Sequence, residues 1–152
     1  MKYPQKVVDM CKFLEDKGAE DIFICDMQGR NVVDYIIVST LTSTAHIQGV
    51  KDYILSECAK LPLVYGDIQV EGYNISHWVV LDVEDVFVHM FTKEERLKYN
   101  FDKLISDGGN VVSIKRMRQE LATEENRKRA REEHEDRIRL KKREKSLKKD
   151  NA

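Results

Sequence analysis

The sequence of 152 residues contains few of the residues that build covalent or metal-held frameworks. Its three cysteines, Cys11, Cys25 and Cys58, form no C-x-x-C pair and have no histidine at ligand spacing. This odd, scattered count argues against a disulfide framework or a zinc site and suits a reducing cytoplasm. The sequence also lacks a run of about 18 apolar residues and the apolar region of a signal peptide, so we expect no membrane partner.

Patterns typical of catalysis are also scarce. No P-loop and no G-x-G-x-x-G motif occurs, so a glycine-rich phosphate site is not indicated. Ser43 and His46 lie close in sequence, but no G-x-S-x-G elbow surrounds them, which favours a helix cap followed by a first-turn histidine. Asp82, Glu84 and Asp85 could hold a divalent metal, although acidic residues are also common in hairpin turns. We expect no cofactor and no bound metal.

The net charge of −1 hides a strong asymmetry along the chain. Residues 1–114 carry a net charge of −7, and residues 115–152 carry a net charge of +6. We therefore expect two domains, an acidic α/β domain over 1–114 and a basic extension over 115–152 that is helical or partly disordered. An acidic domain suits a basic protein partner, whereas a basic extension suits phosphate groups or is simply a solvated helix.

Three helices are predicted in the first domain from apolar residues that recur every three or four positions. The residues expected to begin or end them are Pro4 and Gly18, then Thr42 or Ser43 and Pro62, then the capping-box pair Thr92 and Glu95 with Gly108-Gly109. The residues expected on their buried faces are Val7, Cys11, Leu14, Ile47, Val50, Ile54, Cys58, Leu61, Leu97, Phe101, Leu104 and Ile105.

About five short strands complete the predicted fold, in the order αββαβββα. The predicted strands are Ile22–Asp26 and Asp34–Thr40 around a turn at Gly29, Val64–Val70 with a bend near Gly66, Trp78–Val83, and Val86–Phe91. Such an order indicates an α/β fold, a mixed β-sheet packed with helices. In the extension, acid–base pairs at i,i+4 predict a charged C-terminal helix. These pairs are Glu124–Lys128, Glu125–Arg129, Glu133–Arg137, Glu135–Arg139 and Glu144–Lys148.

The segment Glu71–Phe91 predicts a hairpin with two different faces. With Glu84-Asp85 as a two-residue loop, Val83 faces Val86, Leu81 faces Val88 and Val79 faces Met90. The opposite face pairs Trp78 with Phe91, Val80 with His89, and Asp82 with Phe87. The first face is wholly apolar and requires a core, whereas the second is mixed and indicates a second packed layer or a partner surface.

An ordered series of motifs over residues 5–105 resembles the ribosomal silencing factor family (RsfS, also called Iojap-like). The matching stretches are Asp26-Met27-Gln28-Gly29-Arg30, Asp34-Tyr35, Thr42-Ser43 with His46-Ile47, Glu71-Gly72, Trp78 through Phe91, and Glu94-x-Arg96-x-x-Tyr99. The resemblance implies a fold related to nucleotidyltransferases without their catalytic carboxylates. It also implies binding to the large ribosomal subunit at the ribosomal protein L-fourteen. By occupying that site, family members block joining of the small subunit and lower translation when nutrients are short.

The chain departs from the family pattern in three places. Leu41 stands where the family has glycine, so we expect a different backbone in that turn. Glu84 replaces the glycine of the hairpin turn, which predicts a wider loop than two residues. The extension from about Lys115 is expected to have no counterpart in the family's minimal domain.

The leading hypothesis is a non-enzymatic factor, a monomer or weak homodimer, that docks on L-fourteen. The residues expected at this contact are Trp78, Val80, Glu71, Asp82 and Asp85, and those expected to reach ribosomal RNA are Arg116, Arg118, Lys128, Arg129 and Arg131. One alternative is an assembly factor for the large subunit, as in organellar relatives. The others are a magnesium-dependent nucleotidyltransferase-like enzyme using Asp82, Glu84 or Asp85, and an RNA-binding protein that acts through its extension alone.

Overall fold

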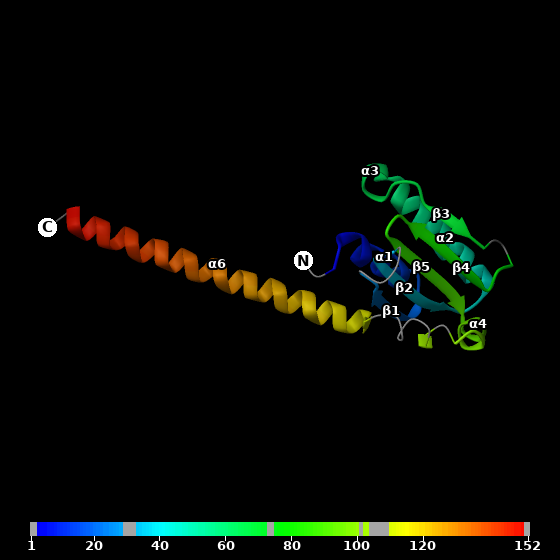
Figure 1. Cartoon of the computed structure of the whole chain (residues 1–152). Helices are drawn as coiled ribbons and strands as arrows, with labels where there is room; N and C mark the ends of the chain where they lie inside the picture. Colours follow the sequence, from blue (N-terminus) through cyan, green and yellow to red (C-terminus); the bar gives the residue numbers. More distant parts are fainter. Residues whose placement is uncertain (1–2, 29–32, 73–74, 101, 104–109, 151–152) are drawn as a thin grey trace. The chain divides into compact units, whose positions relative to one another are not determined.

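The computed structural model describes residues 3–28, 33–72, 75–100, 102–103 and 110–150, and within them it contains a mixed α/β unit and a long helix (Figure 1). The chain divides into two compact units, residues 1–114 and residues 115–152. Three expectations fall on residues outside the described part of the chain: the turn at Gly29, the burial of Phe101, Leu104 and Ile105, and a helix end at Gly108-Gly109. No helix of the described part is long and apolar enough to cross a membrane.

The first unit is built on one mixed sheet of six strands in the order β3-β4-β5-β2-β1-β6. The strands are β1 (Glu20–Asp26), β2 (Tyr35–Leu41), β3 (Gln69–Glu71), β4 (Trp78–Val83), β5 (Val86–Thr92) and β6 (Asn110–Ser113). β2 and β5 run parallel at the centre, and the other neighbouring strands are antiparallel. The fold class is therefore confirmed, although β6 was not predicted. It is a four-residue edge strand that pairs with β1, too short to give a clear sequence pattern.

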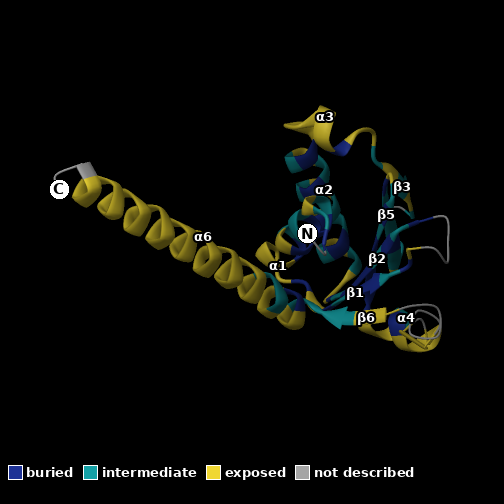
Figure 2. Ribbon diagram, turned by 60° about the vertical axis from the view of Figure 1, so that its left-hand side comes forward, coloured by how far each residue is buried: buried dark blue, intermediate teal, exposed yellow. Residues whose placement is uncertain are grey.

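One face of the sheet is covered by the helices α1 (Gln5–Asp16) and α2 (Thr44–Ala59) (Figure 2). Aligned side chains form buried rows across this face, as in Ile24–Ile37–Val88–Leu81. The helices contribute the predicted apolar residues, which are buried at Val7, Cys11, Leu14, Ile47, Val50, Ile54 and Cys58. Burial of apolar surface at about 25 cal/mol per Å² makes this layer the main source of stability.

The opposite face carries a smaller apolar cluster. Its buried members are Cys25, Met27, Val38 and Phe91, and Phe23, Ile36 and Trp78 pack against it while staying partly exposed. The helix α4 (Lys93–Lys98) contacts β2 and β5. Other elements thus cover this face only in part, which leaves side chains of β4 and β5 accessible to solvent.

The predicted strand Val64–Val70 is wrong in its first half. Pro62 begins a single helical turn, α3 (Pro62–Tyr65), because its fixed φ suits the first helical position. The hydroxyl of Tyr65 donates to Asp9 Oδ2 at 2.6 Å and fixes this turn against α1. Strand structure resumes only at β3. Leu61 was also expected to be buried but is 53% exposed, because α2 ends at Ala59 and the helical period no longer applies there.

The capping box predicted at Thr92 and Glu95 is also wrong. The Thr92 side chain makes no cap hydrogen bond and instead lies 3.2 Å from Nδ1 of His77. Leu97, expected on the inner face of α4, is 71% exposed, and Arg96 is buried in its place.

Leu41, which stands where the family has glycine, is the buried last residue of β2 and does not have a positive φ.

The hairpin of β4 and β5 has the predicted register throughout, from Trp78 opposite Phe91 to Val83 opposite Val86. The wider loop expected from Glu84 is wrong, since Glu84 adopts φ +59° at the first position of a two-residue loop. Lys6 of α1 holds the turn with Nζ 3.1 Å from Glu84 Oε2 and 3.4 Å from Asp85 Oδ1. The Asp85 carbonyl also accepts the backbone N–H groups of Asp34 and Tyr35. These contacts offset the conformational cost of a non-glycine residue in the left-handed region.

The second unit consists of α6 (Ile114–Asp150), a helix of 37 residues. Its side chains from residue 122 to residue 149 are exposed. Two of the predicted i,i+4 pairs have their charged atoms within ion-pair distance, Arg129–Glu125 at 2.9 Å and Arg139–Glu135 at 3.9 Å. Each exposed ion pair of this kind contributes little to stability. The helix therefore depends on many weak ion pairs together and on residues that favour helix formation.

We expect Gly72→Ala to destabilise the first unit by about 1–3 kcal/mol, because strained backbone carries costs of this size. Gly72 has φ +90°, and a Cβ there would lie 2.6 Å from the backbone oxygen of Trp78. The matched control is Gly49→Ala within α2, where an added Cβ meets nothing within 4 Å. The control should be neutral or stabilise by about 0.5–1 kcal/mol. Urea unfolding of both variants measures the difference, and an equal effect of the two substitutions would contradict the close approach at Gly72.

Candidate functional site

The partly open face of the sheet presents a set of side chains that we call the docking face. By the register of the strands, Trp78, Val80 and Asp82 of β4 lie on the same side as Phe87 and His89 of β5. Glu71 of β3 pairs with Val80 and extends the same side to the edge of the sheet. The structure thus brings together four of the five residues expected at the partner contact: Trp78, Val80, Glu71 and Asp82.

Asp85 stands apart from these four. It lies in the hairpin turn beyond Val83, and its carboxylate is 3.4 Å from Lys6 Nζ on α1. Its carbonyl is used by the backbone of β2. Its role in the described structure is therefore to hold the turn.

Trp78 is half-buried at the centre of an aromatic group. Its ring stacks on Phe91 with the centroids 4.8 Å apart, and Phe91 is fully buried. The ring centroid of Tyr99 is 5.6 Å from that of Trp78, and Tyr99 is 47% exposed. Trp78 is accordingly neither a free surface residue nor a core residue. One part of the indole covers Phe91, and the remainder is accessible.

His89 fixes the orientation of the indole. Trp78 Nε1–H donates a hydrogen bond to His89 Nδ1 at 3.0 Å. An Nδ1 that accepts requires the neutral imidazole with its proton on Nε2. Burial lowers the pKa of His89 to about 4, so the neutral form persists at physiological pH. At neutral pH the histidine is therefore a hydrogen-bond acceptor that positions Trp78.

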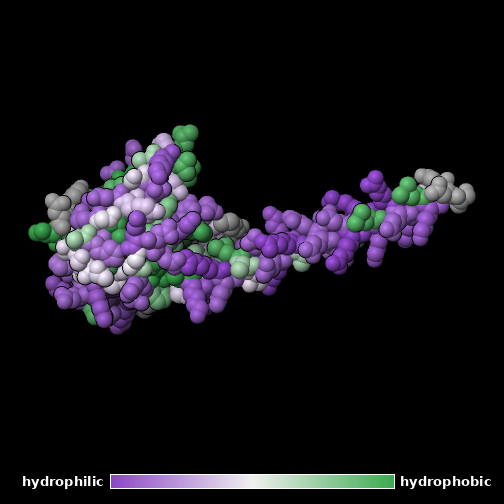
Figure 3. Space-filling view, turned by 180° about the vertical axis from the view of Figure 1, so that it is seen from behind, coloured by the Kyte–Doolittle hydropathy of each residue, from purple (hydrophilic) through white to green (hydrophobic). Residues whose placement is uncertain are grey.

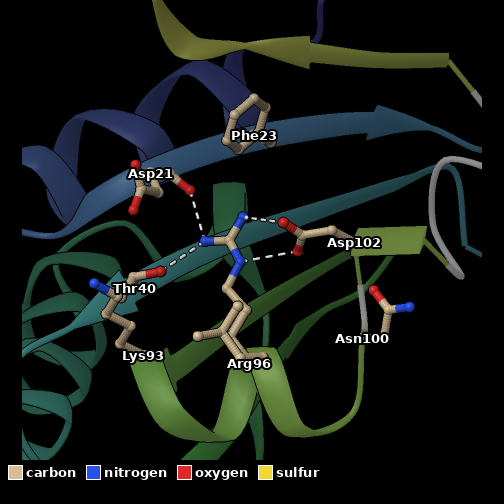
Figure 4. Close-up of a pocket in the computed structure, with 8 residues that line it drawn as sticks. Asp21, Phe23, Thr40, Lys93, Arg96, Asn100 and Asp102 are labelled. Carbon is tan, nitrogen blue, oxygen red and sulfur yellow. Dashed lines mark hydrogen bonds and ion pairs between the residues drawn. The ribbon is translucent and has the colours of Figure 1, made fainter.

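Sequence reasoning did not assign a role to Arg96, which anchors the helix that carries Tyr99 (Figure 4). Arg96 Nε and Nη2 donate to the two carboxylate oxygens of Asp102 at 2.9 and 3.3 Å. Arg96 Nη1 donates to the Asp21 carbonyl at 2.8 Å and to Thr40 Oγ1 at 2.7 Å. Asp21 has φ +48° and lies where the pairing of β1 with β2 is irregular. The guanidinium therefore donates to a backbone carbonyl at a point where the regular hydrogen bonds between the strands are interrupted. The motif Glu94-x-Arg96-x-x-Tyr99 contained this signal, because it includes both the anchoring arginine and, three positions later, the aromatic residue.

The Ser43–His46 pair is a structural cap, as the sequence indicated. Ser43 Oγ accepts the backbone N–H of His46 at 3.1 Å. Both ring nitrogens of His46 are engaged, because Nδ1 accepts from the Thr42 N–H at 3.0 Å and Nε2 lies 2.6 Å from the Lys17 carbonyl. His46 is therefore not available as a base for the Ser43 hydroxyl. Burial also raises the pKa of the Cys58 thiol to about 11, which keeps it protonated.

Metal ligands do not converge in the part of the chain that the structure describes, where no group of three or more His, Cys, Asp or Glu side chains could hold an ion. Of the three carboxylates considered for magnesium, Glu84 and Asp85 pair with Lys6. Asp82 instead lies on the docking face opposite Phe87. These positions do not resemble a catalytic arrangement.

The residues expected to contact RNA are all exposed on α6. They are Arg116, Arg118, Lys128, Arg129 and Arg131. Two of them have acidic partners on the same helix, because Arg116 Nε is 3.4 Å from Glu120 and Arg129 Nη2 is 2.9 Å from Glu125. These pairs partly neutralise the charges offered to a phosphate.

Comparison with known proteins gives a consistent result. The model of a family described as "Ribosomal silencing factor during starvation" matches residues 1–146, so it extends into α6, contrary to the expectation for the extension. A protein of Bacillus subtilis (strain 168) named ribosomal silencing factor RsfS is 37% identical over 97 residues, which are 61% of this chain and 78% of that protein. A mouse protein named "Mitochondrial assembly of ribosomal large subunit protein 1" is 25% identical over 104 residues, which are 64% of this chain and 44% of that protein.

Two solved structures share the fold. A crystal structure of a protein from Bacillus halodurans aligns with a TM-score of 0.55 and 30% identity, covering 66% of this chain and 94% of that one. A crystal structure of a protein from Chromobacterium violaceum aligns with a TM-score of 0.59 and 27% identity, covering 70% of this chain and 87% of that one. Each of these two alignments covers about two thirds of this chain.

The stability of the first unit should depend on pH through His89. Because burial lowers its pKa from 6.5 to about 4, the unfolded chain binds more protons between these values. The contribution of His89 is thus complete above about pH 6.5 and falls as the pH decreases toward 4, by about 3 kcal/mol in total. Urea unfolding at several pH values measures this loss, and the fluorescence of Trp78, the single tryptophan, reports its hydrogen bond.

The control for this titration is His89→Asn. Asparagine offers an oxygen that can accept from the indole but does not titrate in this range. The variant should lose much of the pH dependence between pH 6.5 and 4, whereas the carboxylates titrate as before. An unchanged pH dependence in the variant would show that another group is responsible.

Arg96→Lys should destabilise the first unit by about 1–3 kcal/mol although the charge is kept. A single ammonium group cannot reproduce the planar set of contacts to Asp102, Asp21 and Thr40. Lys93→Gln is the matched control, because Lys93 lines the pocket that also contains Arg96 (Figure 4) but is itself exposed. This variant should change stability by less than about 0.5 kcal/mol. Unfolding curves and Trp78 emission together test the link, since a loosened α4 moves Tyr99 away from the indole.

Proposed function

Because the chain belongs to the ribosomal silencing factor family, we propose that it binds the large ribosomal subunit at the ribosomal protein L-fourteen and blocks joining of the small subunit. In this proposal it acts in the cytoplasm as a monomer or weak homodimer and lowers translation when nutrients are limiting. The observation that carries the proposal is the docking face, which presents the half-buried Trp78 within the family's central motif.

The docking face has the composition of a protein-binding surface. Tryptophan and tyrosine are enriched among the residues that dominate binding energy. Here Trp78 lies beside Tyr99 and stacks on the buried Phe91. The Trp78–His89 hydrogen bond and the Phe91 stack hold the indole in place before a partner arrives. Such pre-organisation lowers the entropy cost of binding.

The charge of the first unit fits a basic ribosomal protein. Residues 1–114 carry a net charge of −7, and Glu71 and Asp82 flank the apolar part of the docking face. Complementary charge increases the association rate and helps to reject other partners. We include Glu71 and Asp82 in the proposed contact and assign Asp85 to the turn. The exposed basic residues of α6 are proposed to contact ribosomal RNA.

The proposed factor works by occupying a site and not by a reaction. His46 and Ser43 are committed to structural hydrogen bonds, and two of the three hairpin carboxylates pair with Lys6. Phosphoryl transfer would need carboxylates that converge on a metal beside bound phosphate groups. The arrangement of the described residues supports binding.

A role in assembly of the large subunit is the second candidate. It is supported by the name of the mouse relative, which refers to mitochondrial large-subunit assembly. The same docking face would serve both roles, since each requires a contact with the large subunit. Adding purified small subunits to a complex of this protein with mature large subunits separates the roles, because only a silencing factor prevents their joining.

Trp78→Ala should weaken binding to large ribosomal subunits by about 2 kcal/mol or more, as expected for a hot-spot tryptophan. Co-sedimentation with purified large subunits measures the binding. Because the indole also covers Phe91, a moderate loss of stability is expected as well, and circular dichroism must show that the variant is folded under the assay conditions.

The matched control is Leu63→Ala on α3, another exposed apolar residue, at 101% relative exposure. This variant should co-sediment like the unaltered protein. The proposal is wrong if the unaltered protein fails to co-sediment with large subunits. The assignment of Trp78 is wrong if a folded Trp78→Ala variant still binds and blocks joining of the small subunit as the unaltered protein does.

A further inference from the structure

The positive charge of α6 is concentrated in its last third. Residues 137–149 contain eight Lys or Arg and one Glu, whereas residues 119–136 contain four Lys or Arg and seven Asp or Glu. The middle of the helix is therefore net acidic, and the net charge of residues 137–149 is +7. We call residues 137–149 the basic segment.

The positive charges of the basic segment are also less often paired with acidic side chains than those of the rest of the helix. Among its described side chains, Arg139 is the one with ion pairs, at 3.9 Å from Glu135 and 3.7 Å from Asp136. Nearer the start of α6, Arg116 and Arg129 have acidic partners. The charges that follow Arg139 are thus available to an external anion.

The helical period gathers these charges on one side. At 3.6 residues per turn, six of the eight fall within an arc of about 140°. The six are Arg137, Lys141, Lys142, Lys145, Lys148 and Lys149. At a rise of about 1.5 Å per residue the row is about 18 Å long, the length of several phosphate spacings in a nucleic-acid strand.

The distribution of apolar residues argues against a membrane. Ile138 falls inside the basic arc, and Leu140 and Leu147 fall on the other side of the helix with exposures of 59% and 57%. A helix that lies in a bilayer interface needs a continuous apolar face opposite its charges. Figure 3 shows this end of the chain as hydrophilic with isolated hydrophobic residues.

The composition also indicates the type of nucleic-acid contact. Residues 114–150 contain no Phe, Trp or Tyr, so the helix offers no aromatic platform for unstacked bases. Lysine ammonium groups recognise phosphates as point charges, without reading base sequence. A regular row of such groups fits the backbone of a double-stranded RNA better than a single strand.

We propose that the basic segment is an RNA-binding element that contacts the phosphate backbone of an RNA duplex. This inference deepens the proposed function, because a factor on the large subunit is surrounded by ribosomal RNA. It places the main RNA contact at residues 137–149 and not at Arg116–Arg131. The docking face and the basic segment would then bind protein and RNA separately.

The test uses the full chain and a fluorescent A-form RNA duplex, with anisotropy measured over a range of about 50 to 200 mM salt. The triple variant Lys141→Gln, Lys142→Gln, Lys145→Gln removes three charges from the arc and keeps good helix formers. We expect affinity at about 100 mM salt to fall at least tenfold, and the slope of log K against log[salt] to become shallower by about 2–3, because each phosphate contact contributes about 0.9.

The matched control is Lys128→Gln, Arg129→Gln, Arg131→Gln, which removes three charges about 18 Å away on the same helix. At that distance screening by salt is strong, so the control should bind the duplex within about threefold of the unaltered protein. Circular dichroism confirms that both triple variants keep the helix.

Several results would overturn the inference. Equal losses in the two triple variants would mean that overall charge and not the basic segment binds RNA. Failure to bind the duplex would exclude RNA as the ligand, and stronger binding to phosphatidylserine vesicles than to the duplex would indicate a lipid surface. Trp78→Ala should leave duplex binding unchanged. If the unaltered protein does not bind the duplex but shows Trp78-dependent binding to large subunits, this inference is contradicted and the proposed function still stands.

Discussion

The register between β4 and β5 decides which side of the sheet Trp78 presents. Successive strand residues point to opposite faces, so a slip by one residue would turn the indole into the helix-covered core and expose Val79, Leu81 and Val83. The two-residue turn at Glu84-Asp85 prevents this slip, and Lys6 of α1 holds both carboxylates. The first helix therefore helps to determine the identity of a surface on the opposite side of the sheet.

Alternation within β4 and β5 made this hairpin predictable, because one of its faces is wholly apolar and the other is mixed. Its turn was not predictable, since the cost of a positive φ at Glu84 is offset by contacts with residues distant in sequence. The same holds at Tyr65, where a hydroxyl bound to Asp9 and the preceding Pro62 favour a helical turn over the strand that local composition suggested. Local patterns thus identified the elements, and tertiary contacts determined where they bend or end.

The site was predictable to a similar extent. The position of Trp78 and its neighbours on β4 follows from strand periodicity alone. Tyr99 lies beside Trp78 only because Arg96 of α4 forms hydrogen bonds to the irregular part of β1 and to Thr40. A buried arginine in a short helix has no apolar periodicity that would reveal it. The family motif contained both residues, but only the structure shows that one positions the other.

The distribution of charge gives the two units different physical roles. In the acidic unit, carboxylates near the docking face are held at fixed positions by the sheet, which favours selective recognition of one protein surface. In α6 the lysines are long, exposed and free to rotate, which favours tolerant contact with a repeating phosphate backbone. Within α6, the acidic middle lies between the basic segment and the start of the helix, so the uncompensated positive charge is grouped at one end. One chain can therefore carry a specific contact and a sequence-independent contact.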